Sequence, residues 1–360
     1  MLLRNRTVLA ATVASVLAAS VWTVAAVDLA QIRSDFQPGA VVSAAEFNEL
    51  FDAINENFAA TEAFINELEA QLSTLEAEKA TLQRQLGELS ALLVGVTRPD
   101  ADTILFDGVN VQLVNGEGDT ESSNGLGNLI IGYHEAPPNL TAGDRDGSHY
   151  LIVGSQHRFS SYGGIVVGWR NTATARWASV SGGFGNTASG PGATISGGSN
   201  NSASEGSASV TGGMNNVASG PGATVSGGTN NAADGGFAAV SGGEGNTAAG
   251  SWSSVTGGED NAATAAHSSV SGGVGNTAHG AAASVTGGES NTAGNTAASV
   301  TGGLRNSASR WASVSGGVDN IARQDYSSIS GGSSNDVRGV ASSILGGQGV
   351  VLTDHTATHP

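Results

Sequence analysis

The sequence predicts a mainly β fold, a parallel β-solenoid of short turns preceded by a long α-helical coiled coil. Three observations support this prediction. Glycine pairs recur every 15 residues through the second half of the chain, apolar residues follow a 3-4 spacing in the first half, and the composition is poor in large apolar residues. With 54 glycines and 5% aromatic residues among 360, the chain cannot build one bulky core, so burial must be spread along its length.

Charge and cysteine content exclude several classes of function. The formal net charge is −17, and Lys79 is the only lysine. Clustered Lys and Arg are needed for sequence-independent nucleic-acid binding and for a polybasic membrane patch, so neither partner is expected. Without cysteine there is no disulfide, thiolate metal site or cysteine nucleophile.

The N-terminus is typical of a secretory signal. Arg4 and Arg6 precede an uncharged stretch that ends in small residues around Ala26, which predicts a signal peptide at residues 1–26 and a short N-terminal segment at 27–42. The protein is therefore expected to be exported to the extracellular space or a bacterial cell surface. The alternative is an uncleaved anchor, because the uncharged stretch is just long enough to span a bilayer.

Residues 43–97 are predicted to form a coiled coil. Ser43 and Glu46 read as a capping box at its start, and Pro99 helps to end it. At 1.5 Å per residue the helix is roughly 70 Å long. Because no second helix is expected elsewhere, the partners should be copies of the chain, and bulky phenylalanines favour more than two strands, a homotrimer. The two seam positions hold Phe51, Phe58, Ile65, Leu72, Lys79, Leu86, Leu93 and Phe47, Ile54, Thr61, Leu68, Leu75, Leu82, Leu89.

A β transition at residues 98–127 leads to the repeats at 128–349. Residues 104–106 and 109–114 look like short strands with a turn at Asn115-Gly116. In the repeats, a β-branched residue stands two residues before each glycine pair: Val180, Ile195, Val210, Val225, Val240, Val255, Val270, Val285, Val300, Val314, Ile329 and Ile344. An asparagine follows each pair: Asn186, Asn201, Asn216, Asn231, Asn246, Asn261, Asn276, Asn291, Asn306, Asn320 and Asn335.

A unit of this length fits one coil of a β-solenoid with two short strands and two tight turns. One Val or Ile per turn points inward and stacks at about 4.8 Å on the next, and each asparagine amide is expected to bond to the amides above and below. Including Ile131-Gly132, Val153-Gly154 and Val167-Gly168, the sequence predicts fifteen turns, about 70 Å of solenoid. A disordered Gly/Ser linker, the alternative, has no reason to keep a β-branched residue in register.

The unit at residues 178–190, Ala-Ser-Val-Ser-Gly-Gly-Phe-Gly-Asn-Thr-Ala-Ser-Gly, resembles the head repeats of trimeric autotransporter adhesins of the YadA type. Those repeats carry a Ser-Val-Ala-Ile-Gly core and an Ala-x-Ala-x-Gly second strand, and the resemblance covers roughly residues 125–349. It implies a left-handed parallel β-roll that trimerises, a surface location, and adhesion, sometimes to extracellular-matrix proteins such as collagen.

Three departures from that family limit what the resemblance implies. Ser-Gly-Gly or Thr-Gly-Gly replaces the Ala-Ile-Gly element, which thins the core and removes the matched binding motif. Residues 350–360 read as a C-terminal tail without the amphipathic strands of the family's membrane barrel, and the coil precedes the repeats. The chain is therefore expected not to anchor itself as an autotransporter does.

No catalytic, cofactor or metal site is predicted, and the protein is expected not to be an enzyme. His134 and His149, with Glu135, Asp144 and Asp146, are the weak metal candidates in the irregular first turns. His157 occupies the asparagine register, so a hydrogen bond to Asn171 is its more economical role. His267 and His279 are isolated, His355 and His359 lie in a tail expected to fray, and no serine has a matched His and Asp.

The functional hypothesis is an exported homotrimeric fibre, adhesin-like or structural, that presents a repetitive β-roll. The alternative is an ice- or glycan-binding solenoid. Ice binding would use outward hydroxyls such as Ser209/Thr211, Ser254/Thr256, Ser284/Thr286 and Ser299/Thr301. Aromatic side chains near the turns are the candidate contacts for an extracellular glycan or protein receptor: Trp177, Trp252, Trp311, Tyr326 and Phe237.

Overall fold

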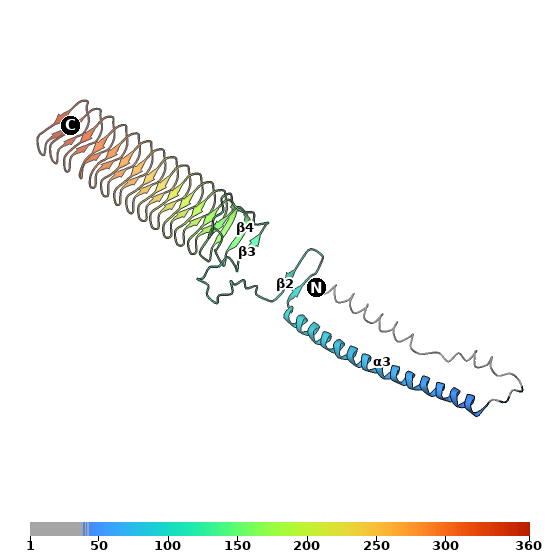
Figure 1. Ribbon diagram of the computed structural model, residues 1–360. Coiled ribbons are helices and arrows are strands. Elements are labelled where there is room, and N and C mark those ends of the chain that lie inside the picture. The colour runs from blue at the N-terminus through green and yellow to red at the C-terminus, as the bar shows by residue number, and fades with distance from the viewer. Residues whose placement is uncertain (1–38, 40, 42) are drawn as a thin grey trace. The chain divides into compact units, whose positions relative to one another are not determined.

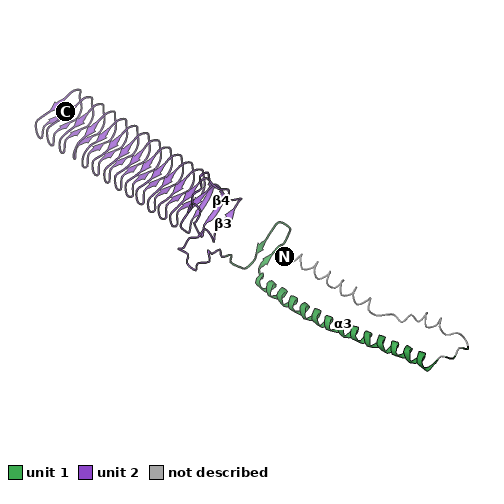
Figure 2. Cartoon of the chain, in the orientation of Figure 1, with its two compact units in different colours: residues 1–111 green, residues 112–360 purple. Residues whose placement is uncertain are grey.

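A computed structural model describes residue 39, residue 41 and residues 43–360. The predicted signal peptide and nearly all of the segment at 27–42 lie outside the described residues. The chain divides into two units, residues 1–111 and residues 112–360 (Figure 2). The first holds a helix and a small hairpin, and the second is a parallel β-solenoid of about 14 turns (Figure 1).

The helix α3 (Ala44–Leu92) begins at the predicted capping box. The Ser43 hydroxyl accepts from the Glu46 backbone N–H at 3.3 Å, and the Glu46 carboxylate accepts from the Ser43 backbone N–H at 2.9 Å. The hydrogen bond with Ser43 lowers the pKa of Glu46. The helix ends before the predicted boundary at 97, because Gly95 adopts a φ of +85° and leads into a strand.

A two-stranded hairpin follows the helix. Strand β1 (Val96–Thr97) pairs antiparallel with β2 (Leu105–Phe106), so the expected strand at 104–106 is present in shorter form. The expected strand at 109–114 is wrong, because no neighbouring segment of the described chain pairs with that backbone in a sheet.

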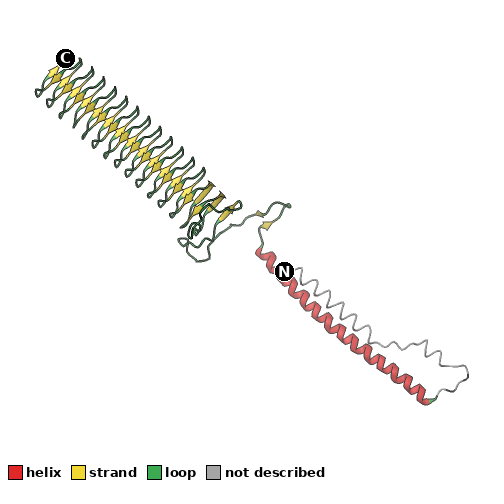
Figure 3. Cartoon of the chain, turned by 45° about the horizontal axis from the view of Figure 1, so that its top comes forward, coloured by secondary structure: helices red, strands yellow, loops and turns green. Residues whose placement is uncertain are grey.

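The solenoid is built from two parallel sheets, visible as stacked arrows in Figure 3. The 16-stranded sheet runs through β3 (Leu129–Ile131), β4 (Leu151–Ser155), β6 (Ile165–Trp169), β8 (Ser179–Val180), β10 (Thr194–Ile195), β12 (Ser209–Val210), β14 (Thr224–Val225), β16 (Ala239–Val240), β18 (Ser254–Val255), β20 (Ser269–Val270), β22 (Ser284–Val285), β24 (Ser299–Val300), β26 (Ser313–Val314), β28 (Ser328–Ile329), β30 (Ser343–Ile344) and β32 (Thr358–His359).

The second sheet lies on the other side of each turn and has 14 strands. It runs through β5 (Arg158–Phe159), β7 (Thr172–Ala173), β9 (Thr187–Ala188), β11 (Ser202–Ala203), β13 (Val217–Ala218), β15 (Ala232–Ala233), β17 (Thr247–Ala248), β19 (Ala262–Ala263), β21 (Thr277–Ala278), β23 (Thr292–Ala293), β25 (Ser307–Ala308), β27 (Ile321–Ala322), β29 (Asp336–Val337) and β31 (Val351–Leu352).

The core is a thin column between the sheets. Each turn buries the Val or Ile of one strand and the Ala of the other, as at Val180 and Ala188. The register keeps them aligned, since Val180 pairs with Ile195 and Ala188 with Ala203. Small alanines in most turns let the two strands of a turn lie close together.

A third column of parallel bridges joins the residues that directly follow the glycine pairs. Phe184 bridges Ser199, which in turn bridges Met214, and the series continues to Gln348. This column cannot be predicted from the sequence, because its positions carry unrelated residues. Each turn is therefore hydrogen-bonded to its neighbours along three lines. These bonds pair the backbone N–H and C=O groups, which would be costly to bury without partners.

Both ends of the solenoid differ from the prediction. The tail at 350–360 forms a further part of the stack, because Val351–Leu352 pairs with β29 and Thr358–His359 pairs with β30. At the start, β3 has no counterpart in the 14-stranded sheet. The intervening loop is tied down by Arg145, whose guanidinium donates to the carbonyl oxygens of His134, Glu135 and His157. The 16-stranded sheet therefore holds a strand for each of the fifteen predicted turns and adds β32, whereas 14 turns contribute a strand to the second sheet.

Candidate functional site

The candidate site lies on the turn that leads from the 14-stranded sheet to the 16-stranded sheet. One position of this turn has left-handed backbone in every repeat, and Gly192 and Gly222 fill it at φ of +66° and +65°. A residue with a Cβ costs roughly 1–2 kcal/mol there, which glycine avoids. Five repeats nevertheless carry aromatic residues, with φ between 52° and 60°: Trp177, Phe237, Trp252, Trp311 and Tyr326. We call these five residues the aromatic column.

The rings of the aromatic column are 42–61% exposed, and four of them stack in pairs. Phe237 and Trp252 have ring centroids 4.4 Å apart with planes inclined by 15°, and Trp311 and Tyr326 are 5.2 Å apart at 14°. These separations are close to the strand spacing of about 4.8 Å, so the ring planes lie across the axis of the solenoid. Trp177 instead meets the buried Tyr162 edge to face at 6.1 Å.

Two arginines that were not among the predicted site residues flank the aromatic column. The guanidinium carbon of Arg176 lies 5.0 Å from the centroid of Trp177, and that of Arg310 lies 4.8 Å from Trp311. Arg310 also donates through Nε to Asp325 at 3.1 Å, and this hydrogen bond lowers the pKa of the Asp325 carboxyl. The Arg-Trp dipeptide occurs at two equivalent turns in the sequence, and this pattern could have identified both arginines. Both arginines pack over rings, a geometry that is favourable for cation–π attraction.

The asparagines of the ladder are buried, and their side chains bond to the backbone. For Asn231, Nδ2 donates to the carbonyl oxygens of Gly227 and Gly243 at 2.9 Å each, and Oδ1 accepts from the N–H of Asn246 at 3.0 Å. The pattern repeats from Asn171 to Asn335. Each amide thus closes a turn and ties it to the next through the backbone, so the predicted bonds from amide to amide are replaced by bonds from amide to backbone.

His157 takes the place of an asparagine at the first turn of this ladder. Its buried ring accepts from the Asn171 N–H through Nδ1 at 3.2 Å, the partner that the sequence predicts, while Nε2 lies 3.0 Å from the Val153 carbonyl oxygen. This arrangement needs a neutral ring with its proton on Nε2. Burial is the main cause that lowers the pKa of His157, because the charged form loses its hydration.

We expect the His157→Asn variant to fold and to remove part of the acid sensitivity of the solenoid. With the folded pKa below the unfolded value of about 6.5, the unfolded chain binds the proton more tightly. The stabilising contribution of neutral His157 is complete above that pH and is lost as the pH falls below it. Urea unfolding between pH 7.5 and 5.5 should therefore show a shallower pH slope in the variant. An unchanged slope, or the same change in a His279→Asn control, would contradict this role.

The outward face of the 16-stranded sheet carries two columns of hydroxyls. Ser209, Ser254, Ser284 and Ser299 are half-buried, and Thr211, Thr256, Thr286 and Thr301 are exposed, as the ice-binding hypothesis requires. Thr194 Oγ1 donates to Ser209 Oγ at 3.2 Å, linking two turns along this face. Ice binding by this face stays a prediction.

The remaining candidates form no centre. Within the described residues, no three His, Asp or Glu side chains gather so that they could hold a metal ion. His149 Nε2 accepts from the Asn115 N–H at 3.3 Å, and Asp144 pairs with Arg158 at 3.2 Å.

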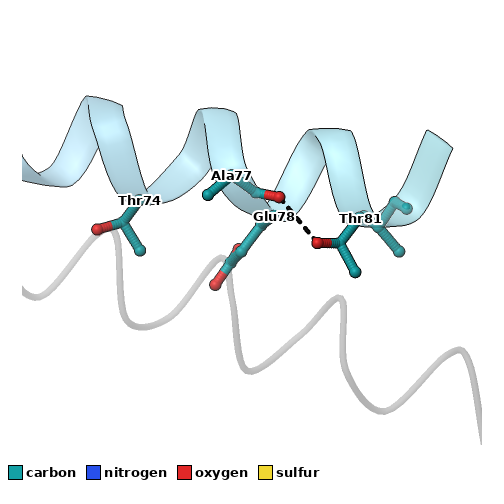
Figure 4. Close-up of a pocket in the computed structure, with 5 residues that line it drawn as sticks. Thr74, Ala77, Glu78 and Thr81 are labelled. Carbon is teal, nitrogen blue, oxygen red and sulfur yellow. Dashed lines mark hydrogen bonds between the residues drawn. The ribbon is translucent and has the colours of Figure 1, made fainter. Parts of the chain in front are cut away.

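A shallow pocket on α3 is lined by Thr74, Ala77, Glu78, Thr81 and Leu82 (Figure 4). The Thr81 hydroxyl there donates to the Ala77 carbonyl oxygen at 3.0 Å, so it serves the helix.

No protein-family model matches the chain, and no curated protein matches it significantly. Among the described helices, none is long and apolar enough to cross a membrane.

Proposed function

We propose that the chain is an exported, non-enzymatic protein that assembles as a homotrimer through α3 and presents the solenoid as an adhesin-like or structural fibre at a cell surface. The single observation that carries the proposal is the exposure of the helix seam. Phe58 is 71% exposed, Ile54 is half-buried, and the ten other large seam residues are 43–69% exposed: Phe47, Phe51, Ile65, Leu68, Leu72, Leu75, Leu82, Leu86, Leu89 and Leu93.

A seam of this kind is unstable in water without a partner. Each Leu, Ile or Phe gains about 1.5–3 kcal/mol on full burial, so ten or more such residues in one stripe provide a strong drive for association. The 3-4 spacing matches the pattern that packs in a coiled coil, where each apolar side chain fits between four residues of the facing helix. Other copies of the chain carry the complementary surface.

The repetitive surface of the solenoid favours a fibre that presents a surface over an enzyme. Its repeats, 15 residues long in the regular part of the sequence, resemble the left-handed β-roll of trimeric autotransporter heads, and they expose hydroxyls, amides and the aromatic column. A stack of near-identical turns offers the same surface many times, which suits presentation and multivalent contact. The signal-like N-terminus supports export.

Sedimentation equilibrium tests the assembly. We expect residues 27–360 to sediment with the mass of three chains, and Ile65→Lys/Leu72→Lys to reduce that mass to one chain, because two charges would enter the seam. The matched control is Ala63→Lys/Ala70→Lys, which adds the same charge on exposed positions outside the two seam positions and should remain trimeric. A monomeric parent protein, or a trimeric seam variant, would contradict the proposal.

A further inference from the structure

The aromatic column is periodic along the solenoid. Trp177, Trp252 and Tyr326 occupy equivalent turn positions that are five turns apart, as the strand register shows. Phe237 stands one turn before Trp252, and Trp311 one turn before Tyr326. At about 4.8 Å per turn, the clusters recur every ~24 Å. The turns between them carry smaller residues or a histidine at the same position: Gly192, Ser207, Gly222, His267, Ala282 and Ala297.

Each cluster has a supported side and a free side. Phe237 lies over Gly222, where a Cβ would come within 2.8 Å of its Cδ1 and Cε1 atoms, and Trp177 lies over Gly163 in the same way at 3.2 Å. The other face of Phe237 is covered by Trp252. Trp252 and Tyr326 are each the second ring of a stacked pair, so one face of each has no ring of the pair over it. They are the most exposed members of the aromatic column, at 57% and 61%. The outer face of Tyr326 looks along the axis toward Ala341, and that of Trp252 looks toward His267 and then Ala282.

The chemistry around these faces favours an uncharged ligand with both apolar and hydroxyl surface. The chain is strongly acidic, and the solenoid contains no lysine. Arg176 and Arg310 are engaged over Trp177 and Trp311, and Arg310 is paired with Asp325. A sugar ring combines a face of C–H groups, which packs on an aromatic ring, with hydroxyls that can bond to indole N–H, phenol and serine groups at the edge.

The spacing distinguishes a glycan from a protein partner. A stable protein interface buries one continuous patch of about 800 Å² on each side, with its aromatic anchors clustered near the centre. Here the aromatic clusters recur every ~24 Å, and three turns that carry Gly, Ser, Ala or His lie between one cluster and the next. A long polymer can engage such separated sites together, and each weak contact then raises the effective concentration for the next.

We propose that the aromatic column binds a neutral polysaccharide, with three sugar-stacking sites at Trp177, Phe237/Trp252 and Trp311/Tyr326. The proposal names the ligand class of the fibre described above and rests on that function for presentation at a surface. Binding itself is a property of the solenoid in each chain.

Depletion isotherms on insoluble cellulose, chitin and a β-1,3-glucan, with alginate as the anionic probe, test the proposal on residues 27–360. We expect binding to at least one neutral polymer and none to alginate. The triple variant Trp177→Gly/Trp252→Gly/Tyr326→Gly should lose at least tenfold in affinity, and each single variant about two- to fivefold. Glycine is the residue that this backbone already accepts at 192 and 222, so the variants should keep their circular dichroism and unfolding midpoint.

The control Ala282→Gly/Ala297→Gly changes the same turn position without removing a ring, and it should bind as the parent protein does. Trp252→Phe keeps a ring and should retain most of the affinity. The proposal is overturned if no neutral polymer binds, if the triple variant binds normally, or if only alginate binds. Loss of the trimer mass in the triple variant would also overturn it, because the column would then be a contact between copies. Self-association is measured by sedimentation and glycan binding by depletion, so failure of one is distinguished from failure of the other.

Discussion

Gly243→Ala is expected to destabilise the solenoid by about 3–5 kcal/mol, one of the largest effects of any single substitution in the chain. Gly243 has a φ of +90°, where a side chain is strained. A Cβ there would also collide with the carbonyl oxygen of Gly258 and with Nδ2 of Asn246, and would lie 2.9 Å from the Gly258 N atom. Backbone of the next turn cannot move aside without breaking the column of bridges.

The adjacent glycine provides the control. Gly242 has no positive φ, and a Cβ built on it would meet nothing within 4 Å. Gly242→Ala should therefore be neutral, or stabilising by about 0.4–1 kcal/mol, because alanine reduces the freedom of the unfolded chain. Urea unfolding followed by circular dichroism compares the two variants directly. Equal midpoints would show that the close approach between turns is not what fixes the second glycine of each pair.

Asn231→Ala is expected to cost about 2–6 kcal/mol, because it leaves one buried and one partly buried backbone group without partners. The Gly227 carbonyl oxygen and the Asn246 N–H both bond to the Asn231 side chain, whereas the Gly243 carbonyl oxygen keeps its bond from the Thr229 N–H. Each unpaired group accounts for about 1–3 kcal/mol. Hydrogen exchange should show the loss first at the Asn246 amide.

The neighbouring asparagine is the matched control for this prediction. Asn230 is exposed and has a φ of 55°, a conformation that glycine adopts freely. Asn230→Gly removes only the bond that Asn215 Nδ2 donates at 3.2 Å on the surface, so stability should change little. If Asn231→Ala and Asn230→Gly had the same effect, the buried amides would not be the element that ties the turns together.

Much of the fold could be predicted, because each turn has one inward β-branched residue and the glycine pairs fix its period. Val180 and Ile195 pair in register, as the periodicity indicates. The third column of bridges could not be predicted, since Phe184, Ser199 and Met214 share no chemistry. The last part of the stack was missed because residues 350–360 contain no glycine pair, yet their backbone still pairs with the preceding turn.

The candidate site was predictable in its members but not in its geometry. The sequence pattern alone places the aromatic side chains near turns. The stacking of Phe237 on Trp252 depends on which residues are equivalent in successive turns, and this position also accepts Gly, Ala, Ser and His. At Trp311 the equivalence is hidden further, because the glycine-pair interval that contains it is 14 residues instead of 15.

That shorter interval leaves the asparagine ladder intact. Asn320 lies 14 residues after Asn306 and still donates its N–H to the Asn306 side chain at 3.0 Å. The missing residue falls between Ala308 and Val314, at the corner that carries Trp311, so the stack absorbs a change of length there without losing a bridge. The same corner is the place to splice foreign peptides into this scaffold: an engineer could display epitopes at chosen heights, with the interval between them set in whole steps of the repeat.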